Sequence, residues 1–347
     1  MQARESCRFL EVPKIGTPFP VQTGPHAEEV QRRHMRWADD NGVFRSEGER
    51  RRFGAMDIGA LANLLYPGAS SPGDTQLVAD WCAWLLLRDD RWDATEDPKE
   101  WERLAGCDRA YLRLMRQAPW RAPGWTLSDD EASDNLYGAL ADLCARSRRH
   151  ASLESMPDPV DRRFVAAMKG FFFASVRETA YQRRGNYPTL SEYVRMRSVT
   201  GGLDILTFVL AALDGIRLPK GLLSDPAVRR LTDASHNACC WHNDLVSLKK
   251  EIASGEVHNL VLVLQNDPEH GCRSLPGALG AAVAMVREEL GTFTELEREV
   301  RFMGGPWARP AEWYARMLGH RVGGVIGWQE ACGARYAEAL AASGTGH

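Results

Sequence analysis

The stretch WHNDLVSLKKEIASGEVHNLVLVL, residues 241–264, carries polar side chains at a regular spacing within an otherwise apolar helical pattern. Asn243, Ser247 and Glu251 stand four residues apart, and this spacing turns through only about 80° around an α-helix. Their amide, hydroxyl and carboxylate oxygens are therefore expected on one face, as ligands for a hard cation. Lys250, beside them, can bind an anion as a point charge. A helix cap with scattered surface polars is the alternative, but the apolar pattern already continues before Asn243.

A second group of acidic residues ends the stretch DTQLVADWCAWLLLRDDRWD, residues 74–93. Helical geometry places Asp89 and Asp93 on one face with Asp90 beside them, so that carboxylates converge. Like charges this close repel unless a cation lies among them, and Mg²⁺ prefers such oxygen ligands. An acidic helix end in solvent remains an equal alternative for this pattern by itself.

Apolar residues recur at spacings of three and four along nearly the whole chain, which favours an all-α protein. We find no internal repeat and no long flexible linker, and therefore expect one large helical domain over 18–341, with tails at 1–17 and 342–347. The predicted helices are 26–40, 54–66, 74–91, 98–117, 130–150, 158–184, 189–213, 223–252, 256–266, 274–303 and 309–341.

Composition narrows the classes of function. Of the 347 residues, 44% are hydrophobic and 26% are charged, and the net charge of −3 leaves no general basic surface for nucleic acid. The eight cysteines form no CxxC pair, so reduced core thiols are expected. The N-terminus lacks the features of a signal peptide, and apolar runs such as 203–213 are too short to span a bilayer. We expect a cytoplasmic protein without stable membrane association.

The two polar motifs together resemble the paired metal motifs of bacterial class I terpene synthases, also called terpene cyclases. The first motif reads Asp89-Asp90-x-x-Asp93, and the second reads Asn243-Asp244-x-x-Ser247-x-x-Lys250-Glu251. The resemblance covers about residues 18–340. It implies a class I terpenoid synthase-like α-helical bundle with a central active-site cavity and three Mg²⁺ ions, held by Asp89, Asp90, Asp93, Asn243, Ser247 and Glu251.

Further positions match the same family. Arg197 lies where the family carries its diphosphate-sensing arginine, and Thr200 and Gly201 match the linker and effector positions of its induced-fit triad. Arg335-Tyr336 matches the family's RY pair, with Trp328 seven residues earlier. Glycine in a helix is unfavourable, and close helix packing would explain the Gly201-Gly202 pair; the resemblance to the family instead implies a helix break that turns the Gly201 carbonyl toward the substrate.

The resemblance implies ionisation of a linear isoprenyl diphosphate and cyclisation of the resulting carbocation. Farnesyl diphosphate is the expected substrate and geranylgeranyl diphosphate the next, giving a sesquiterpene or a diterpene. Arg197, Lys250, Arg335 and Tyr336 would bind the diphosphate. An apolar pocket must then shield the cation, and aromatic faces stabilise it. The residues predicted to line the pocket are Trp328, Cys82, Leu85, Leu86, Phe172 and Phe173.

Three alternatives remain. A chain-elongating isoprenyl diphosphate synthase would normally carry a second aspartate-rich motif where this chain has NDLVSLKKE. A catalytically inactive helical binding protein of the same fold would show eroded ligands, and none is eroded. A metal-dependent hydrolase of the HD type is weakest, because His242 and His258 form no HD or HxxxH pairing and are expected to be core groups or to support the site.

Asp244 belongs to the motif, but the helical register turns it away from the metal face. We therefore expect it to pair with a neighbouring basic group, and its replacement to cost less than the loss of Asn243. A homodimer is possible, although no stretch of the sequence indicates an interface.

Overall fold

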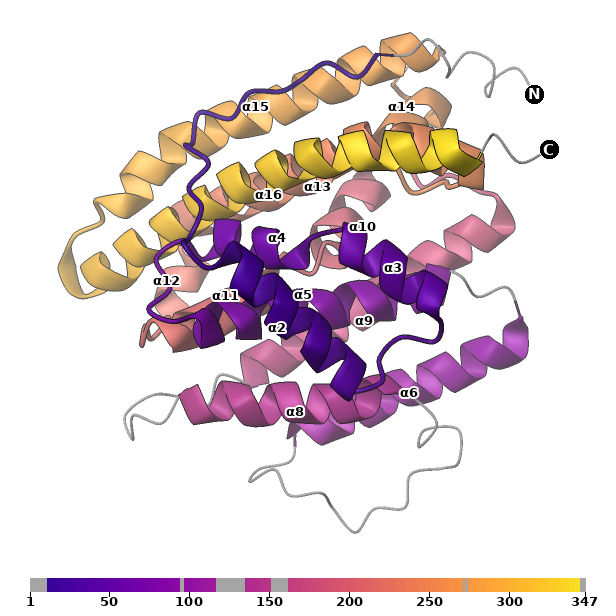
Figure 1. The fold of residues 1–347 in the computed structure, drawn as a ribbon. Helices are drawn as coiled ribbons and strands as arrows, with labels where there is room; N and C mark the ends of the chain where they lie inside the picture. The colour runs from indigo at the N-terminus through magenta and orange to yellow at the C-terminus, as the bar shows by residue number, and fades with distance from the viewer. Residues whose placement is uncertain are drawn as a thin grey trace. The chain divides into compact units, whose positions relative to one another are not determined.

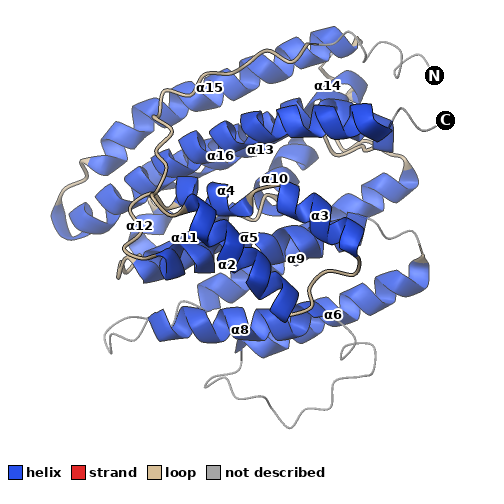
Figure 2. Cartoon of the chain, viewed as in Figure 1, coloured by secondary structure: helices blue, strands red, loops and turns tan. Residues whose placement is uncertain are grey.

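The computed structural model describes residues 11–93, 97–116, 135–150, 162–270, 272 and 274–343, and the side chains of Asp93, His150 and 332–343 lie outside that description. Every regular element in the described ranges is helical (Figures 1 and 2), which confirms the all-α prediction. The chain forms two compact units. The N-terminal unit comprises Thr23–Val176 and Gly202–Leu218, and the C-terminal unit comprises Met1–Gln22, Arg177–Gly201 and Pro219–His347.

The N-terminal unit is built around helix α5 (Pro72–Asp93), which packs against α2, α4, α8 and α11. Trp81 and Trp84 of α5 are fully buried, and their indole nitrogens donate to Ser147 Oγ (3.0 Å) and Leu136 O (2.9 Å). These bonds satisfy the polar atoms that such large side chains carry into a core. The other helices of this unit are α2 (Ala27–Asp40), α3 (Glu47–Ala55), α4 (Ile58–Leu65), α6 (Pro98–Arg116), α8 (Asn135–His150), most of α9 (Arg162–Arg184) and α11 (Leu203–Leu213).

The C-terminal unit has α13 (Pro226–Ser254) at its centre, packed against α10, α12, α14, α15 and α16 (Figure 1). Asp225 caps α13 through bonds to Ala227 N and Val228 N, and Gly255 ends it with φ of 77°, a value that favours glycine. The remaining elements are α10 (Leu190–Thr200), α12 (Lys220–Ser224), α14 (Leu260–Asn266), α15 (Leu275–Arg301), the 3₁₀ turn η2 (Gly305–Trp307) and α16 (Ala308–Ser343).

The described N-terminal segment, residues 11–22, also belongs to the C-terminal unit, where it runs in extended form along α15 and α16 (Figure 1). The Phe19 ring meets Phe293 of α15 edge to face, with ring centroids 4.9 Å apart. A Cβ atom on Gly323 of α16 would lie only 3.3 Å from the carbonyl oxygens of Phe19 and Pro20. Glycine therefore allows the segment and the helix to approach closely.

Several predicted helix limits need correction. The predicted helix 54–66 is two helices, because Asp57 adopts φ of 54° and caps α4 through Ala60 N. Residues 47–53, before this predicted helix, are also helical: Ser46 caps α3, whose N-terminal residue is Glu47. The predicted helix 223–252 starts as the short α12, which ends where Asp225 becomes the cap of α13.

Within the described residues, Leu190–Leu213 is the one segment long and apolar enough to cross a membrane by length and composition. It consists of two helices, α10 and α11, that are separated at Gly201 and Gly202, and 61% of its apolar window is buried inside the protein. A broken, mostly buried segment matches core helices of a folded protein and gives weak support for a membrane span.

Candidate active site

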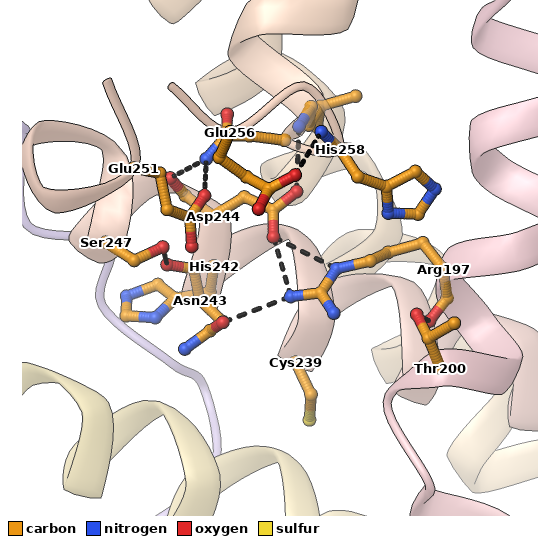
Figure 3. Close-up of polar contacts among 12 residues, drawn as sticks. Arg197, Thr200, Cys239, His242, Asn243, Asp244, Ser247, Glu251, Glu256 and His258 are labelled. Atoms are coloured by element: carbon orange, nitrogen blue, oxygen red, sulfur yellow. Dashed lines mark hydrogen bonds and ion pairs between the residues drawn. The ribbon is translucent and has the colours of Figure 1, made fainter. Parts of the chain in front are cut away.

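Helix α13 places Asn243, Ser247 and Glu251 along one side, as Figure 3 shows, and all three are half-buried. Leu245 and Leu248, between them in sequence, are fully buried in the core of the C-terminal unit. Apolar packing on the core side thus fixes the rotation of α13 and leaves the three oxygen-bearing residues accessible. This arrangement is the one that the helical register predicts.

Each of these three side chains has a defined contact. Ser247 Oγ donates to the backbone oxygen of Asn243 (2.7 Å), and Asn243 Oδ1 accepts a hydrogen bond from Arg197 Nη2 (3.0 Å). Glu251 Oε2 accepts from Asn259 Nδ2 (2.7 Å). Burial, followed by repulsion from Asp244, raises the pKa of Glu251 to about 7. A nearby cation would favour the ionised form of a carboxyl group whose pKa is raised in this way.

Arg197, from α10, is anchored by the buried carboxylate of Asp244 (Figure 3). Its Nη2 and Nε atoms lie 2.7 Å and 3.0 Å from Asp244 Oδ1. The other carboxylate oxygen accepts hydrogen bonds from Tyr193 Oη and from Leu260 N. Although burial opposes it, the Asp244 charge keeps the pKa of Arg197 well above its usual value. The prediction that Asp244 pairs with a basic group is therefore confirmed, and that group is Arg197.

Both histidines near the motif are buried in the C-terminal unit, as expected. His242 Nδ1 is hydrogen-bonded to Gln329 Oε1 (2.7 Å), and burial lowers the pKa of His242. His258 packs against the Tyr193 ring (centroids 5.0 Å apart), and its Nδ1 lies 2.7 Å from Glu178 Oε1. Neither belongs to a group of metal ligands: among the described residues, no three His, Cys, Asp or Glu side chains cluster closely enough to hold one ion.

The predicted helix break is confirmed. Helix α10 ends at Thr200, Gly201 keeps a helical φ of −64°, and Gly202 adopts φ of 66° immediately before α11. Thr200 is buried, with its hydroxyl 3.4 Å from the backbone oxygen of Arg197. The turn thus begins one residue after Thr200 and directly follows the helix that carries Arg197. The direction of the Gly201 carbonyl toward a substrate stays a prediction.

The aspartate motif lies at the C-terminal end of α5, in the N-terminal unit. Asp89 is partly exposed and accepts a hydrogen bond from Ser175 Oγ (3.2 Å), while Asp90 is exposed. The side chain of Asp93 lies outside the described residues. Acidic groups at a helix C-terminus face the negative end of the helix dipole, so a bound cation would relieve an unfavourable arrangement.

Arg88, which the sequence analysis did not single out, supports this helix end. Its guanidinium pairs with Asp108 (2.6 Å and 3.2 Å) and lies over the rings of Phe171 and Phe172, 5.0 Å and 4.7 Å from their centroids. Its Nη1 atom, buried without a hydrogen-bond partner, is 3.8 Å from Asp89 Oδ1. The sequence signal that could have identified Arg88 is its place at the end of an apolar run, directly before the acidic pair.

The predicted wall residues are not equivalent. Cys82, Leu85 and Phe172 are buried and Leu86 is half-buried, all in the N-terminal unit. Phe173 is 62% exposed and carries the Lys169 ammonium 5.6 Å from its ring centroid. Such exposure does not fit a wall that shields a cation from water, so we withdraw the wall assignment for Phe173.

The remaining predicted residues lie in the C-terminal unit. Lys250 is exposed on α13, and Trp328 is half-buried on α16. Helix α16 also includes Arg335 and Tyr336, but their side chains lie outside the described residues. The structure therefore confirms that Trp328 and the RY pair share one helix, and their contacts with a substrate stay predictions.

The oxygen donors on α13 fit a hard divalent cation. They comprise an amide, a hydroxyl and a carboxylate, without the thiolate or imidazole groups that soft metals select. Two side chains outside this set of donors hold its members in place. The Asn259 amide binds Glu251, and the Arg197 guanidinium binds Asn243. Asn259 and Tyr193 were missed by sequence reasoning, because neither belongs to the motif and only tertiary contacts bring them to it.

Comparisons with known proteins agree with this site. The family model described as terpene synthase family 2, C-terminal metal binding, matches residues 80–291, which include both motifs. The chain is 32% identical over 277 residues to a (+)-T-muurolol synthase of Roseiflexus castenholzii that cyclises farnesyl diphosphate, covering 80% of this chain and 79% of the relative. It is 30% identical to epi-isozizaene synthase of Streptomyces coelicolor, over 84% and 76% of the two chains.

Solved structures support the fold. The crystal structure of α-eudesmol synthase aligns with a TM-score of 0.77 at 23% identity, over 92% of this chain and 99% of that one. The family match covers more than half of the chain, and it describes a metal-binding region where the oxygen donors of α13 lie. The chain therefore belongs to the terpene synthase family and is a class I terpene cyclase, a lyase that acts on isoprenyl diphosphates with a divalent metal.

Proposed function

We propose that the enzyme ionises farnesyl diphosphate and cyclises the carbocation to a sesquiterpene, with geranylgeranyl diphosphate and a diterpene as the second choice. The muurolol synthase relative, which cyclises farnesyl diphosphate, supports this order. The observation that most directly supports the proposal is the row of oxygen donors on α13, which lies beside Arg197, a residue that Asp244 already holds in place. We further propose that the protein is cytoplasmic and acts as one catalytic domain over 18–341.

The metal is proposed to be Mg²⁺, three ions in each active site. Asn243, Ser247 and Glu251 would hold one of them, and the aspartates of α5 would hold the others. When bound, the ions neutralise the charge that develops on the leaving diphosphate. The oxygen donors suit this metal, because Mg²⁺ is bound through few carboxylates together with water and substrate phosphate.

The chain's own cations would bind the diphosphate oxygens. Arg197 presents planar N–H donors, and its Asp244 partner fixes the guanidinium before the substrate arrives. Lys250 would add a point charge, and Arg335 and Tyr336 would donate from α16. None of these groups forms a covalent bond in the proposed reaction, so catalysis rests on positioning and on charge stabilisation.

After ionisation, the residues around the hydrocarbon must exclude water. Leu85, Leu86, Cys82 and Phe172 of the N-terminal unit are proposed to serve this purpose, and Trp328 of α16 would offer an aromatic face to the cation. Thr200 and Gly201 are proposed to transmit diphosphate binding from Arg197 to the helix break. The break is suited to this because Gly202 already adopts a conformation that only glycine takes readily.

Product analysis tests the proposal. The purified protein is incubated with Mg²⁺ and separately with C10, C15 and C20 linear diphosphates, and the volatile products are separated and identified by mass spectrometry. We expect a cyclic C15 hydrocarbon or alcohol as the main product. A product from the C20 substrate alone would reassign the chain length, and the absence of a terpene from all three would refute the proposal.

Two controls accompany this experiment. Asn243→Ala and Glu251→Ala are expected to abolish turnover while leaving the helical content, followed by circular dichroism, nearly unchanged. Full activity in either variant would show that the metal assignment on α13 is wrong. Incubation with dimethylallyl and isopentenyl diphosphates tests chain elongation, and a condensation product would identify an isoprenyl diphosphate synthase instead.

A further inference from the structure

Asn259 occupies an unusual position beside the motif of α13. It lies outside the motif, eight residues after Glu251, and its side chain is completely buried in the C-terminal unit. Its Nδ2 atom donates to Glu251 Oε2 (2.7 Å) and to the backbone oxygen of Asp244 (2.7 Å). Its Oδ1 atom accepts from Val261 N (2.9 Å) and thereby caps α14. Both amide hydrogens and the amide oxygen are therefore used in the folded protein.

The neighbouring residue strengthens this connection. Leu260 N donates to Asp244 Oδ2 (2.7 Å), the same carboxylate that holds Arg197. Asn259 and Leu260 thus attach the start of α14 to α13 at two points, Asp244 and Glu251, which are two helical turns apart. These contacts therefore reach Glu251, a proposed metal ligand, and Asp244, which holds the proposed diphosphate-binding residue Arg197.

Glu251 needs such a contact because of its place in α13. The helix ends at Ser254, so Glu251 lies in its last turn and no residue of α13 lies one full turn beyond its side chain. A glutamate side chain also has considerable rotational freedom to lose when it binds an ion. The Asn259 bond restricts this freedom in advance by fixing one carboxylate oxygen.

We propose that Asn259 is a positioning residue for the metal site: by binding Glu251 Oε2 and the Asp244 backbone together, it sets the orientation in which Glu251 receives a divalent cation. This inference rests on the proposed metal-binding function of Glu251. It extends the site from α13 to the start of α14, because the bond that fixes Glu251 Oε2 comes from Asn259. Groups that orient metal ligands typically contribute 10- to 100-fold to metal affinity.

The test uses Asn259→Ser in the full-length chain. Serine can still cap α14, because its hydroxyl accepts from a backbone N–H, but it is too short to donate to both Glu251 and Asp244. Asn259→Asp, which also keeps a capping oxygen, replaces the serine variant if that variant does not fold. The matched control is Asn266→Ser, which removes the amide that donates to Leu262 O (2.8 Å) at the opposite end of the same helix.

Metal binding is measured directly, by titrating each variant with Mn²⁺ in the presence of inorganic pyrophosphate and following free Mn²⁺ by electron paramagnetic resonance. We expect at least about a tenfold weaker Mn²⁺ affinity for Asn259→Ser and an unchanged affinity for Asn266→Ser. In turnover assays, the Mg²⁺ concentration for half-maximal rate should rise by a similar factor, while kcat at saturating Mg²⁺ should recover to within a few-fold of wild type.

A purely structural role predicts a different result, namely lower thermal stability with an unchanged metal affinity in the folded fraction, and that outcome would overturn the proposal. An equal shift in Asn266→Ser would also overturn it. In a Glu251→Ala background, the effect of Asn259→Ser on metal affinity should disappear. Because pyrophosphate replaces the substrate, the titration succeeds even if the assigned isoprenyl chain is wrong; wild-type protein that binds no Mn²⁺ with pyrophosphate would refute the metal assignment and this inference together.

Discussion

Replacing Asp244 with asparagine removes one charge from the buried Arg197–Asp244 pair and keeps the shape of the side chain. Asp244 is 1% exposed, and its carboxylate accepts bonds from Arg197, Tyr193 and Leu260. Breaking a buried ion pair by neutralising one partner costs about 3–5 kcal/mol, since the other charge stays buried. The asparagine amide would also face the donor of Leu260, which adds about 1–3 kcal/mol for an unsatisfied group. We expect a loss of at least about 3 kcal/mol in the free energy of unfolding.

The loss is measured by urea denaturation followed by circular dichroism, in a double-mutant cycle with Arg197→Met. Once Arg197 is absent, Asp244→Asn should cost at least about 1 kcal/mol less, because no buried guanidinium is left unpaired. Asn243→Ala, which removes one acceptor for Arg197, should cost about 1 kcal/mol. Asp244→Asn is therefore expected to lower the free energy of unfolding more than Asn243→Ala does. For turnover we expect the opposite order, with the larger loss in Asn243→Ala. A loss below about 1 kcal/mol for Asp244→Asn, or an equal loss in both backgrounds, would refute this reasoning.

Three further predictions concern other parts of the protein. Gly202→Ala should lower the free energy of unfolding by about 1–2 kcal/mol, because alanine is strained at φ of 66°, and a smaller effect in urea denaturation would place the break in another conformation. Backbone donors from Leu190 and Glu269 lower the pKa of Asp267, so its contribution to stability exists above pH 4 and is lost as the pH falls; urea midpoints of wild type should decline more steeply than those of Asp267→Asn between about pH 5 and pH 2. Chelation of divalent metal should abolish turnover without loss of helical circular dichroism, and restored Mg²⁺ should recover the rate.

Patterns within one helix were predictable from the sequence. The all-α class and the register of Asn243, Ser247 and Glu251 follow from periodicity and residue type, while the break at Gly201 was expected from the family resemblance; the structure agrees with all three. The pairing of Asp244 followed from the same register, because a charge turned toward a core requires a partner. The identity of that partner, Arg197, involved a second helix and needed the fold.

Contacts that cross from one helix to another were not predictable. Asn259 reaches Glu251 only because residues 255–259 turn the chain back onto α13, and Arg88 is held by Asp108 from a different helix. Asp57 adopts a left-handed conformation that sequence periodicity does not encode, so the predicted helix 54–66 missed the separation of α3 from α4. The exposure of Phe173 was equally hidden, since adjacent residues of a helix face different directions.

The extended segment around Phe19 has a consequence for biosynthesis. Its contacts, Phe293 and the glycines of α16, lie close to the opposite end of the sequence. On the ribosome, the segment is synthesised before these partners and must wait for about 300 further residues, roughly 15–60 s at about 5–20 residues per second. The C-terminal unit therefore cannot be completed until α15 and α16 have been synthesised, and long-range closure of this kind slows folding.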